Sequence, residues 1–271
     1  LFIISTLVLS SFGFSHNMFQ FSAAPSVLYS DLNKYGYFLT SHHWYMLYWF
    51  GFSMVLAVLT YALWHRGPVQ PIKARLKKMG YYLGSTGKFA LVTGALIFVG
   101  AGSYIHYNTR VLNQFVVIDE FRDNQANYEK KYVQYLNNNI PIITKTHAKV
   151  DIYPNERRID ALADIVVTNS STQAISKFLV GKPRYTKKWD VVITGGTITE
   201  IDDEFQTAWF EFTQPLLPGE SRTGQLIAHR SHQGFTDGDN DFELVANGTF
   251  INNNSLFPSF VQTVPATPVL C

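Results

Sequence analysis

The chain has 271 residues, of which 46% are hydrophobic and 15% charged, and its formal net charge is +2 at pH 7. That charge is too small to indicate nucleic-acid binding, and no Lys/Arg run is interleaved with aromatic residues as such a face requires. The only cysteine is Cys271, so an internal disulfide is excluded. Residues 1–107 carry few charges and most of the long apolar runs, whereas residues 108–271 have the mixed texture of a soluble domain.

Three apolar runs in residues 1–107 predict transmembrane helices. The run over 1–14 is uncharged but short for a span, as expected for a helix whose first turns are missing. The runs over 43–64 and 89–107 have 22 and 19 residues without a Lys, Arg, Asp or Glu. A helix of ~20 apolar residues crosses the hydrocarbon of a bilayer. Because no span contains an Asp, Glu, Lys or Arg, these helices alone offer no ion pathway, and the small residues of 89–107 predict close helix packing.

The loop predicted over 65–88 sets the orientation of these helices. It contains six basic residues and no acidic one: Arg66, Lys73, Arg75, Lys77, Lys78 and Lys88. By the positive-inside rule this loop is cytoplasmic. The helix over 89–107 then exits the membrane outward, and residues 108–271 are predicted to be extracytoplasmic.

Residues 108–143 are predicted to be a juxtamembrane segment that contains an amphipathic helix over 119–138. Its aromatic residues recur at helical spacings, with acidic residues in the first turn and Lys130 and Lys131 later. We expect this helix to pack on the following domain or on the bilayer surface.

From residue 144 onward the apolar residues alternate with polar ones, which is the period of a β-strand. Turn sequences separate the strand-like runs, among them Thr194-Gly195-Gly196 and Leu217-Pro218-Gly219-Glu220. Several short strands at such spacing predict an all-β domain over 144–271, an antiparallel sandwich or saddle-shaped sheet. The fold class is therefore a membrane α-helical segment followed by an all-β extracytoplasmic domain. Residues 234–241 are expected to form an exposed loop.

No catalytic residue and no metal ligand is predicted in this chain. The sequence has no H-E-x-x-H, no C-x-x-C, no G-x-S-x-G and no phosphate-binding glycine loop. His229 and His232 form an H-x-x-H, but in a strand that spacing points the two rings to opposite faces, so both are interpreted as surface residues. The pair His42-His43 is interpreted in the same way, as headgroup-level histidines rather than metal ligands.

The run Asp237-x-Asp239-x-Asp241 matches the first three ligands of a calcium loop. However, Phe242 stands where that loop needs Gly, and Gly248 stands where it needs a bidentate Glu. A polar loop is therefore favoured over a calcium site.

Several strings occur in an order that resembles a known family. They are Ile152-Tyr153-Pro154 with Arg157-Arg158, Pro215 to Glu220, His232-Gln233-Gly234-Phe235, Asn247 to Asn252, and Leu256-Phe257-Pro258-Ser259. This order resembles the N-terminal β-domain of aminopeptidase N-like zinc metallopeptidases. More narrowly, the chain is similar to bacterial membrane proteins in which an ABC-type permease is fused to such a peptidase. The run Asn108 to Asn113 also fits that fused group.

The resemblance implies that the chain comprises the last permease helices and the substrate-cleft β-domain of a zinc aminopeptidase in the bacterial inner membrane. It implies that zinc and the catalytic residues belong to a following domain that is not in this sequence, so this chain should be inactive alone. The family's N-terminal domain holds the free amino end of a peptide substrate, and Asn247, Thr249 and Asn252 are the expected counterparts. The implied partners are the lipid bilayer, the peptide and, as an open question, an ABC ATPase subunit.

A second interpretation is a non-catalytic, membrane-anchored module that binds or senses an extracytoplasmic ligand for a transporter. The run from Phe257 to Cys271 shows no evident final strand or polar tail. A free-standing sandwich would be expected to have one, so a truncated or frame-shifted aminopeptidase domain is the favoured expectation.

Overall fold

The computed structural model describes residues 14–27, 29, 31, 34–36, 38–64, 71–113, 115–135, 138–183, 185–238, 243–244, 249 and 251–261. The chain divides into two compact units. The helical unit spans residues 1–30, 35–117 and 234–240, and the β unit spans 31–34, 118–233 and 241–271. The span predicted over 1–14 lies outside the described residues except for Phe14.

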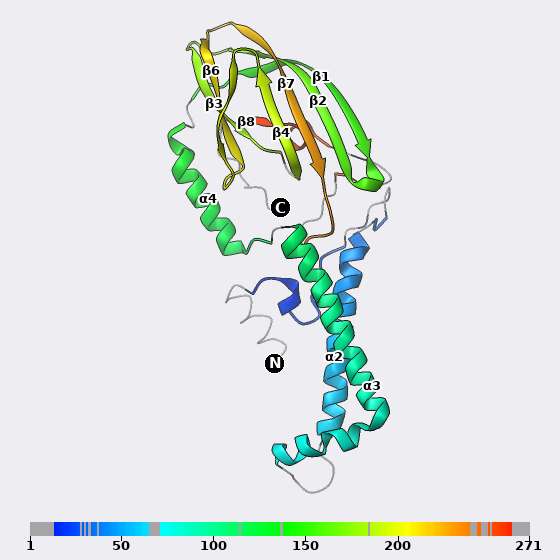
Figure 1. The fold of residues 1–271 in the computed structure, drawn as a ribbon. Helices are drawn as coiled ribbons and strands as arrows, with labels where there is room; N and C mark the ends of the chain where they lie inside the picture. The colour runs from blue at the N-terminus through cyan, green and yellow to red at the C-terminus, as the bar shows by residue number, and fades with distance from the viewer. Residues whose placement is uncertain are drawn as a thin grey trace. The chain divides into compact units, whose positions relative to one another are not determined.

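Two long apolar helices form the frame of the helical unit (Figure 1). Helix α2 runs over Phe38–Leu63, and helix α3 over Ile72–His106, continued by the π-helical turn η2 (Tyr107–Leu112). Both are long and apolar enough to cross a membrane. The prediction of two long apolar helices is confirmed, although α2 begins at Phe38 rather than at residue 43.

Small residues let α2 and α3 lie side by side. A Cβ added to Gly51 would lie 2.7 Å from the backbone nitrogen of Phe98 and 3.0 Å from the carbonyl oxygen of Gly94. A Cβ on Gly94 would meet Val55 at 3.2 Å. Close backbone approach through small residues is typical of helix pairs that have lipid around them, because burial of apolar surface does not drive their association there. The predicted packing role is therefore confirmed for Gly94, whereas Gly100 meets nothing within 4 Å.

The basic loop predicted over 65–88 is wrong from residue 72 onward, because helix α3 begins there. Lys, Arg, Leu and Met, which dominate 72–79, are good helix formers, and charge alone did not mark a loop. Pro71 precedes the first turn, and Gly84 has φ 55° and ψ −165°, a conformation that breaks the helix into two segments. The basic residues Lys73, Lys77 and Lys78 thus lie on a short helix before the kink.

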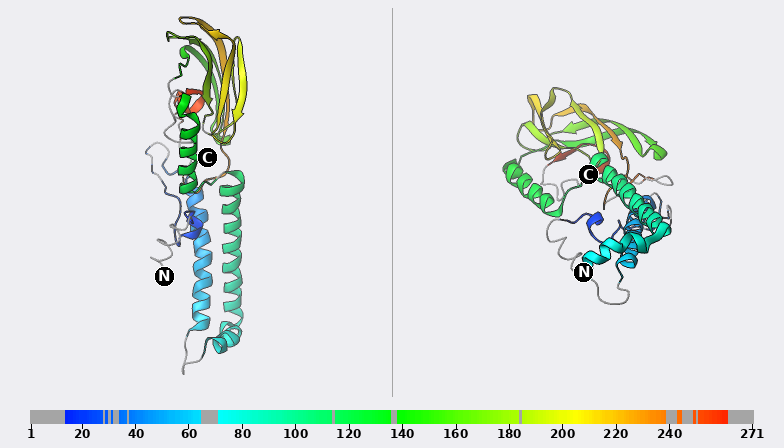
Figure 2. Two further views of the ribbon diagram at one scale, coloured as in Figure 1. Left: turned by 90° about the vertical axis from the view of Figure 1, so that its left-hand side faces the viewer. Right: turned by 60° about the horizontal axis from the view of Figure 1, so that its bottom comes forward.

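The β unit holds two four-stranded antiparallel sheets, with strand orders β1-β2-β7-β4 and β5-β6-β3-β8. The strands are β1 (Ile142–Tyr153), β2 (Arg158–Thr168), β3 (Ile175–Gly181), β4 (Thr186–Ile193), β5 (Gly196–Asp202), β6 (Thr207–Leu216), β7 (Ser221–Ser231) and β8 (Ser259–Val261). The predicted antiparallel β domain is confirmed, with its first strand beginning at Ile142 rather than at residue 144. The expectation that no strand follows Phe257 is wrong, because β8 pairs with β3. Figure 2 shows the two sheets as layers.

The core between the sheets follows the period-two pattern of the sequence. In β2 the buried residues are Ile159, Ala161, Ala163, Ile165 and Val167, each separated by a more exposed neighbour. The opposite sheet contributes aromatic rings, and Phe178 lies 5.3 Å from Phe210 between ring centroids. Burying each large side chain stabilises the fold by ~1.5–3 kcal/mol. The β unit therefore has a core of its own.

Helix α4 (Ile118–Tyr132), continued by the turn η3 (Val133–Tyr135), packs on the β5–β6 side of the β unit. It ends before the predicted residue 138. Tyr128 and Tyr132 are each 4% exposed and pack with Leu179 in one apolar cluster. The Tyr132 hydroxyl donates to Asp202 Oδ2 at 2.6 Å. The predicted amphipathic helix thus packs on the domain, through its aromatic face.

Candidate functional site

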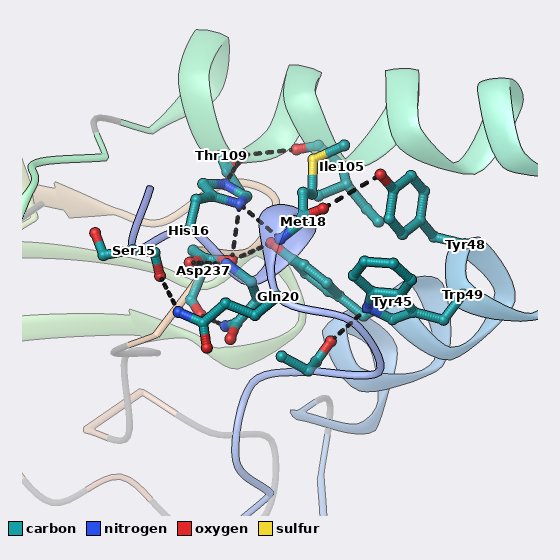
Figure 3. Close-up of polar contacts among 12 residues, drawn as sticks. Ser15, His16, Met18, Gln20, Tyr45, Tyr48, Trp49, Ile105, Thr109 and Asp237 are labelled. Atoms are coloured by element: carbon teal, nitrogen blue, oxygen red, sulfur yellow. Dashed lines mark hydrogen bonds and ion pairs between the residues drawn. The ribbon is translucent and has the colours of Figure 1, made fainter. Parts of the chain in front are cut away.

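A group of polar side chains in the helical unit, all buried except the half-buried Asn17, is the candidate site (Figure 3). It consists of His16, Asn17, Tyr45, Thr109 and Asp237, which we call the Asp237 cluster. The His16 and Asp237 side chains are 4% and 5% exposed, and Thr109 is 1% exposed. Four segments far apart in the sequence thus meet in one place with almost no access to water.

Each member is positioned by a local feature of its segment. His16 is the N-cap of the short helix η1 (Asn17–Phe19), and its side chain accepts from the backbone of that turn. Tyr45 lies on α2, and Thr109 lies in the π-helical turn η2, a type of turn that is often found at functional sites. Asp237 lies on the segment that follows β7 and belongs to the helical unit.

The hydrogen bonds assign the His16 tautomer. Thr109 Oγ1 donates to the carbonyl oxygen of Ile105 at 2.9 Å, so it accepts from His16 Nε2 at 3.1 Å. His16 Nδ1 is then free to accept from the backbone N–H of Met18 at 3.2 Å. The same Nδ1 lies 3.3 Å from Asp237 Oδ1. The neutral ring therefore presents a lone pair to the carboxyl group.

Asp237 is held by donors from two other segments. The Tyr45 hydroxyl donates to Oδ1, and the backbone N–H of Asn17 donates to Oδ2 at 3.0 Å. The Asn17 side-chain amide donates to the Asp237 carbonyl oxygen at 2.8 Å. These bonds tie the residue 237 segment to η1 and to α2.

Burial shifts the two titratable groups of the cluster in opposite directions. Burial, with smaller contributions from Arg110 and His106, lowers the pKa of His16 to about 4. Burial also raises the pKa of Asp237 to about 6, although the hydrogen bonds from Tyr45 and Asn17 act against this. Both effects disfavour the charged form, as expected for groups removed from water. At neutral pH the cluster holds a neutral imidazole beside a buried carboxylate.

The order hydroxyl, imidazole, carboxylate in Thr109, His16 and Asp237 resembles the arrangement of nucleophilic catalysis. Two observations argue against that chemistry here. The Thr109 hydroxyl donates its hydrogen bond to the Ile105 carbonyl oxygen. Thr109 is also only 1% exposed, which leaves no room for a substrate beside it. The arrangement instead cross-links four segments, because buried polar groups that satisfy one another rigidify a structure.

Apolar contacts surround the Asp237 cluster. Phe235 is 2% exposed and packs with Tyr45, Tyr48, Trp49 and Ile105. The exposed loop predicted over 234–241 is therefore wrong for Phe235, Thr236 and Asp237, which are buried, whereas Gly238 is exposed as predicted. The sequence carried a signal for burial at Phe235, but the neighbouring Asp and Gly residues outweighed it.

The calcium alternative is limited by the same contacts. Both carboxylate oxygens of Asp237 accept hydrogen bonds from protein groups, while Asp239 and Asp241 lie outside the described residues. Within the described ranges, no group of three or more His, Cys, Asp or Glu side chains is placed to hold a metal ion.

The residues predicted to hold a peptide are described in part. Asn247 lies outside the described residues, and Thr249 is half-buried. Asn252 is the N-cap of the short helix α5 (Asn253–Leu256), where its Oδ1 accepts from the Ser255 backbone N–H at 2.9 Å. The amide oxygen of Asn252 is thus engaged in capping, and substrate binding by these three residues stays a prediction.

The two histidines of the H-x-x-H motif lie in different environments. His229 is half-exposed and contacts Asp160 Oδ1 at 3.0 Å, as expected for a surface residue. His232 follows the end of β7 and is 3% exposed, so its interpretation as a surface residue is wrong. Burial, with Arg157 and Arg230 nearby, lowers the pKa of His232 to about 4.

The sheet β1-β2-β7-β4 bears an open groove of about 780 Å³. Its polar lining includes Lys145, His147, Asp164 and Gln225, and the Gln225 amide donates to Asp164 Oδ1 at 2.8 Å. Its volume lies within the range of ligand-binding clefts.

Comparison with known proteins found no match to a family model and no matching curated protein.

Proposed function

We propose that the chain is a membrane anchor that carries a β-sandwich on the extracytoplasmic side of a bacterial inner membrane. The observation that carries this proposal is the exposure of the apolar side chains along α2 and α3. Phe50, Phe89 and Leu96 are 59%, 74% and 69% exposed. Only 22% of the most apolar window of each helix is buried within the protein.

Such exposure would be unfavourable in water. Each large apolar side chain left in water forgoes ~1.5–3 kcal/mol of burial, and ordinary soluble proteins bury the apolar face of their helices. In a bilayer the same side chains contact lipid. Helix α2, with 26 residues, is about 39 Å long, which exceeds the ~30 Å of hydrocarbon.

The charges support one orientation in the membrane. Arg75, Lys73, Lys77 and Lys78 lie at the end of the helix pair formed by the C-terminus of α2 and the N-terminus of α3. By the positive-inside rule this end is cytoplasmic. The Asp237 cluster and the β unit then follow on the extracytoplasmic side.

Extraction and proteolysis test the anchor. After alkaline washing the chain should remain in the membrane fraction. Trypsin added outside spheroplasts should cut the β unit, for example at the exposed Lys149, and spare the bonds after Lys73, Lys77 and Lys78. Release by alkali, or cleavage at these three lysines from outside, would contradict the proposal.

We further propose that the β-sandwich is the N-terminal domain of an aminopeptidase N-like zinc peptidase. The support is the ordered strings given above, together with an antiparallel two-sheet domain that follows the apolar helices. In the intact enzyme a zinc ion would polarise the scissile carbonyl and a glutamate would activate water. The sandwich would anchor that chemistry and form one wall of the peptide cleft.

Reading the coding sequence past codon 271 in all three frames tests this step. An H-E-x-x-H followed about twenty residues later by Glu would support it, and the longer protein should then bind zinc and show chelator-sensitive aminopeptidase activity. A stop codon directly after codon 271 with no such motif in any frame would favour the alternative, a non-catalytic binding module. The open groove on the β1-β2-β7-β4 sheet is the observation that favours that alternative.

A further inference from the structure

The first turns of α3 form a separate short helix, Ile72 to Leu83, which we call the basic segment. The conformation of Gly84 breaks it from the rest of α3, and Figure 1 shows it turned across the end of the α2–α3 pair. Two contacts attach it there. Arg75 Nη1 donates to the carbonyl oxygen of Leu63 at 3.4 Å, and the side chain of Leu83 packs over Gly87, where an added Cβ would meet it at 3.1 Å.

The basic segment has an apolar face and a cationic face. Its apolar residues stand four, three and four positions apart: Ile72, Leu76, Met79 and Leu83. That spacing places them on one side of a helix. Leu83 is buried, but Ile72 and Leu76 are 63% and 51% exposed. The opposite side carries Lys73, Lys77 and Tyr81, and Tyr81 is 86% exposed.

The positive charge of the segment is locally uncompensated. Lys73, Arg75, Lys77 and Lys78 fall within six residues, and the sequence has no Asp or Glu between Asp31 and Asp119. An exposed apolar stripe beside a dense cationic face is the pattern of helices that lie in the membrane interface. Clusters of Lys and Arg directly beside a membrane span attract anionic lipid headgroups.

We propose that the basic segment lies in the headgroup layer of the cytoplasmic leaflet and binds anionic phospholipids through Lys73, Lys77 and Lys78. This inference rests on the proposed membrane anchor. Three observations select a lipid surface as the occupant: the complementary charge, the exposed Ile72 and Leu76, and the direct continuity of the segment with the apolar part of α3. Gly84 permits the change of direction from the membrane plane to the membrane normal.

Spin labels on the full chain test the placement. In a Cys271→Ser background, single cysteines replace Met79 on the apolar face, Tyr81 on the cationic face and Leu96 in the apolar part of α3. The chain is reconstituted in nanodiscs of phosphatidylcholine alone or with phosphatidylglycerol. The label at 79 should be accessible to oxygen and protected from a water-soluble nickel chelate in the anionic discs, whereas the label at 81 should be accessible to the chelate.

Charge neutralisation tests the lipid preference. The variant Lys73→Gln, Lys77→Gln, Lys78→Gln should lose the difference between the two lipid compositions at position 79. A matched control neutralises three exposed lysines of the β unit, Lys145, Lys149 and Lys188, and should keep it. Because each basic residue near an anionic surface contributes roughly fivefold, the three lysines together should favour the headgroup-layer position over the aqueous one by about a hundredfold in the anionic discs.

The possible outcomes distinguish failure of the lipid site from failure of the proposed membrane anchor. Oxygen access at Leu96 together with water access at Met79 in both lipids would overturn the lipid site and leave the anchor intact. Water access at Leu96 would overturn the anchor itself. Protection of position 79 from both oxygen and the nickel chelate would mean that protein covers the segment, and it would also overturn the lipid site.

Discussion

The pKa values of His16 and Asp237 are shifted in opposite directions. We therefore predict that the stability of the Asp237 cluster depends little on pH in the wild type and clearly on pH once one of the two residues is replaced. The pKa of His16 is lowered from 6.5 to about 4, so its contribution to stability is present above pH 6.5 and is lost as pH falls through about 4. The pKa of Asp237 is raised from 3.8 to about 6, so its contribution is present below pH 3.8 and is lost as pH rises through about 6.

The two contributions are of similar size. A tenfold change in proton affinity corresponds to about 1.4 kcal/mol, so each group contributes about 3 kcal/mol over its own interval. Between pH 4 and pH 6.5 the folded state has a less protonated His16 and a more protonated Asp237 than the unfolded state. Because the two slopes have opposite signs, they nearly cancel, and the wild-type cluster should be almost insensitive to pH in this range.

Two variants should reveal the slopes. In Asp237→Asn only the histidine titrates, so the cluster should weaken as pH falls from 6.5 to 4. In His16→Asn only the carboxylate titrates, so the cluster should weaken as pH rises from 4 to 6; asparagine is chosen because it also caps a helix. Each variant keeps one backbone amide that reports on the remaining titratable group. In Asp237→Asn it is the N–H of Met18, which donates to His16, and in His16→Asn it is the N–H of Asn17, which donates to Asp237.

Hydrogen exchange of residues 14–20 in the detergent-solubilised full chain measures the effect. After correction for the intrinsic exchange rate, protection should change about hundredfold across the interval in each variant, in opposite directions, and by much less in the wild type. The amides of β2, in the other unit, provide an internal reference. Slopes of the same sign in both variants, or no slope in either, would refute the reasoning.

Three further predictions concern packing and buried polar contacts. Gly51→Leu should destabilise the α2–α3 pair by about 1–3 kcal/mol in thermal unfolding, because the new side chain meets the backbone of α3, whereas Gly100→Leu, which meets nothing, should not. Tyr132→Phe should cost about 1–2 kcal/mol in urea unfolding of the β unit, because Asp202 loses a partly buried donor. Lys131→Gln should cost under about 1 kcal/mol, since the lysine of the Lys131–Asp202 ion pair is half exposed. Equal losses in Tyr132→Phe and Lys131→Gln would contradict the larger contribution expected of Tyr132. Glu243→Gln should lower the free energy of unfolding of the β unit by about 3 kcal/mol, because Arg230 is 0% exposed and its guanidinium contacts Glu243 at 2.6 Å. The control is Glu220→Gln, whose partner Arg222 has a 13% exposed side chain. A loss at Glu243 no larger than the loss at Glu220 would contradict the prediction.

The parts of the fold that could be predicted from sequence are those with a sustained local period. The alternation predicted the strands, and in β2 and β6 it separates the buried Ile165, Val167, Phe210 and Phe212 from their more exposed neighbours. Aromatic residues at helical spacing predicted the face of α4 that packs on the β unit. The basic segment was wrongly predicted to be a loop, because its charged residues were taken to indicate one. Its apolar residues repeat at helical intervals.

The Asp237 cluster could not be predicted, because its members share no local pattern. His16 stands in a segment without periodicity, and Thr109 looks like any polar residue after an apolar run. Asp237 carried a signal for a different site, since it begins a D-x-D-x-D run. Only the return of residues 234–240 to the helical unit brings these side chains together, and that return is a long-range property of the fold.

Strand β1 bears on the choice between the two proposed functions of the β unit. All twelve of its residues are exposed, yet Ile143, Val150 and Ile152 pair with Val167, Ala161 and Ile159, which are buried. Cross-strand partners point to the same face, so these β1 side chains point toward the core side of the sheet, where they are still 38%, 37% and 43% exposed. Each forgoes part of the ~1.5–3 kcal/mol that full burial supplies. A sandwich built to stand alone would be expected to cover that face, whereas one that packs against a further domain would leave it open, and this supports the peptidase proposal over the binding module.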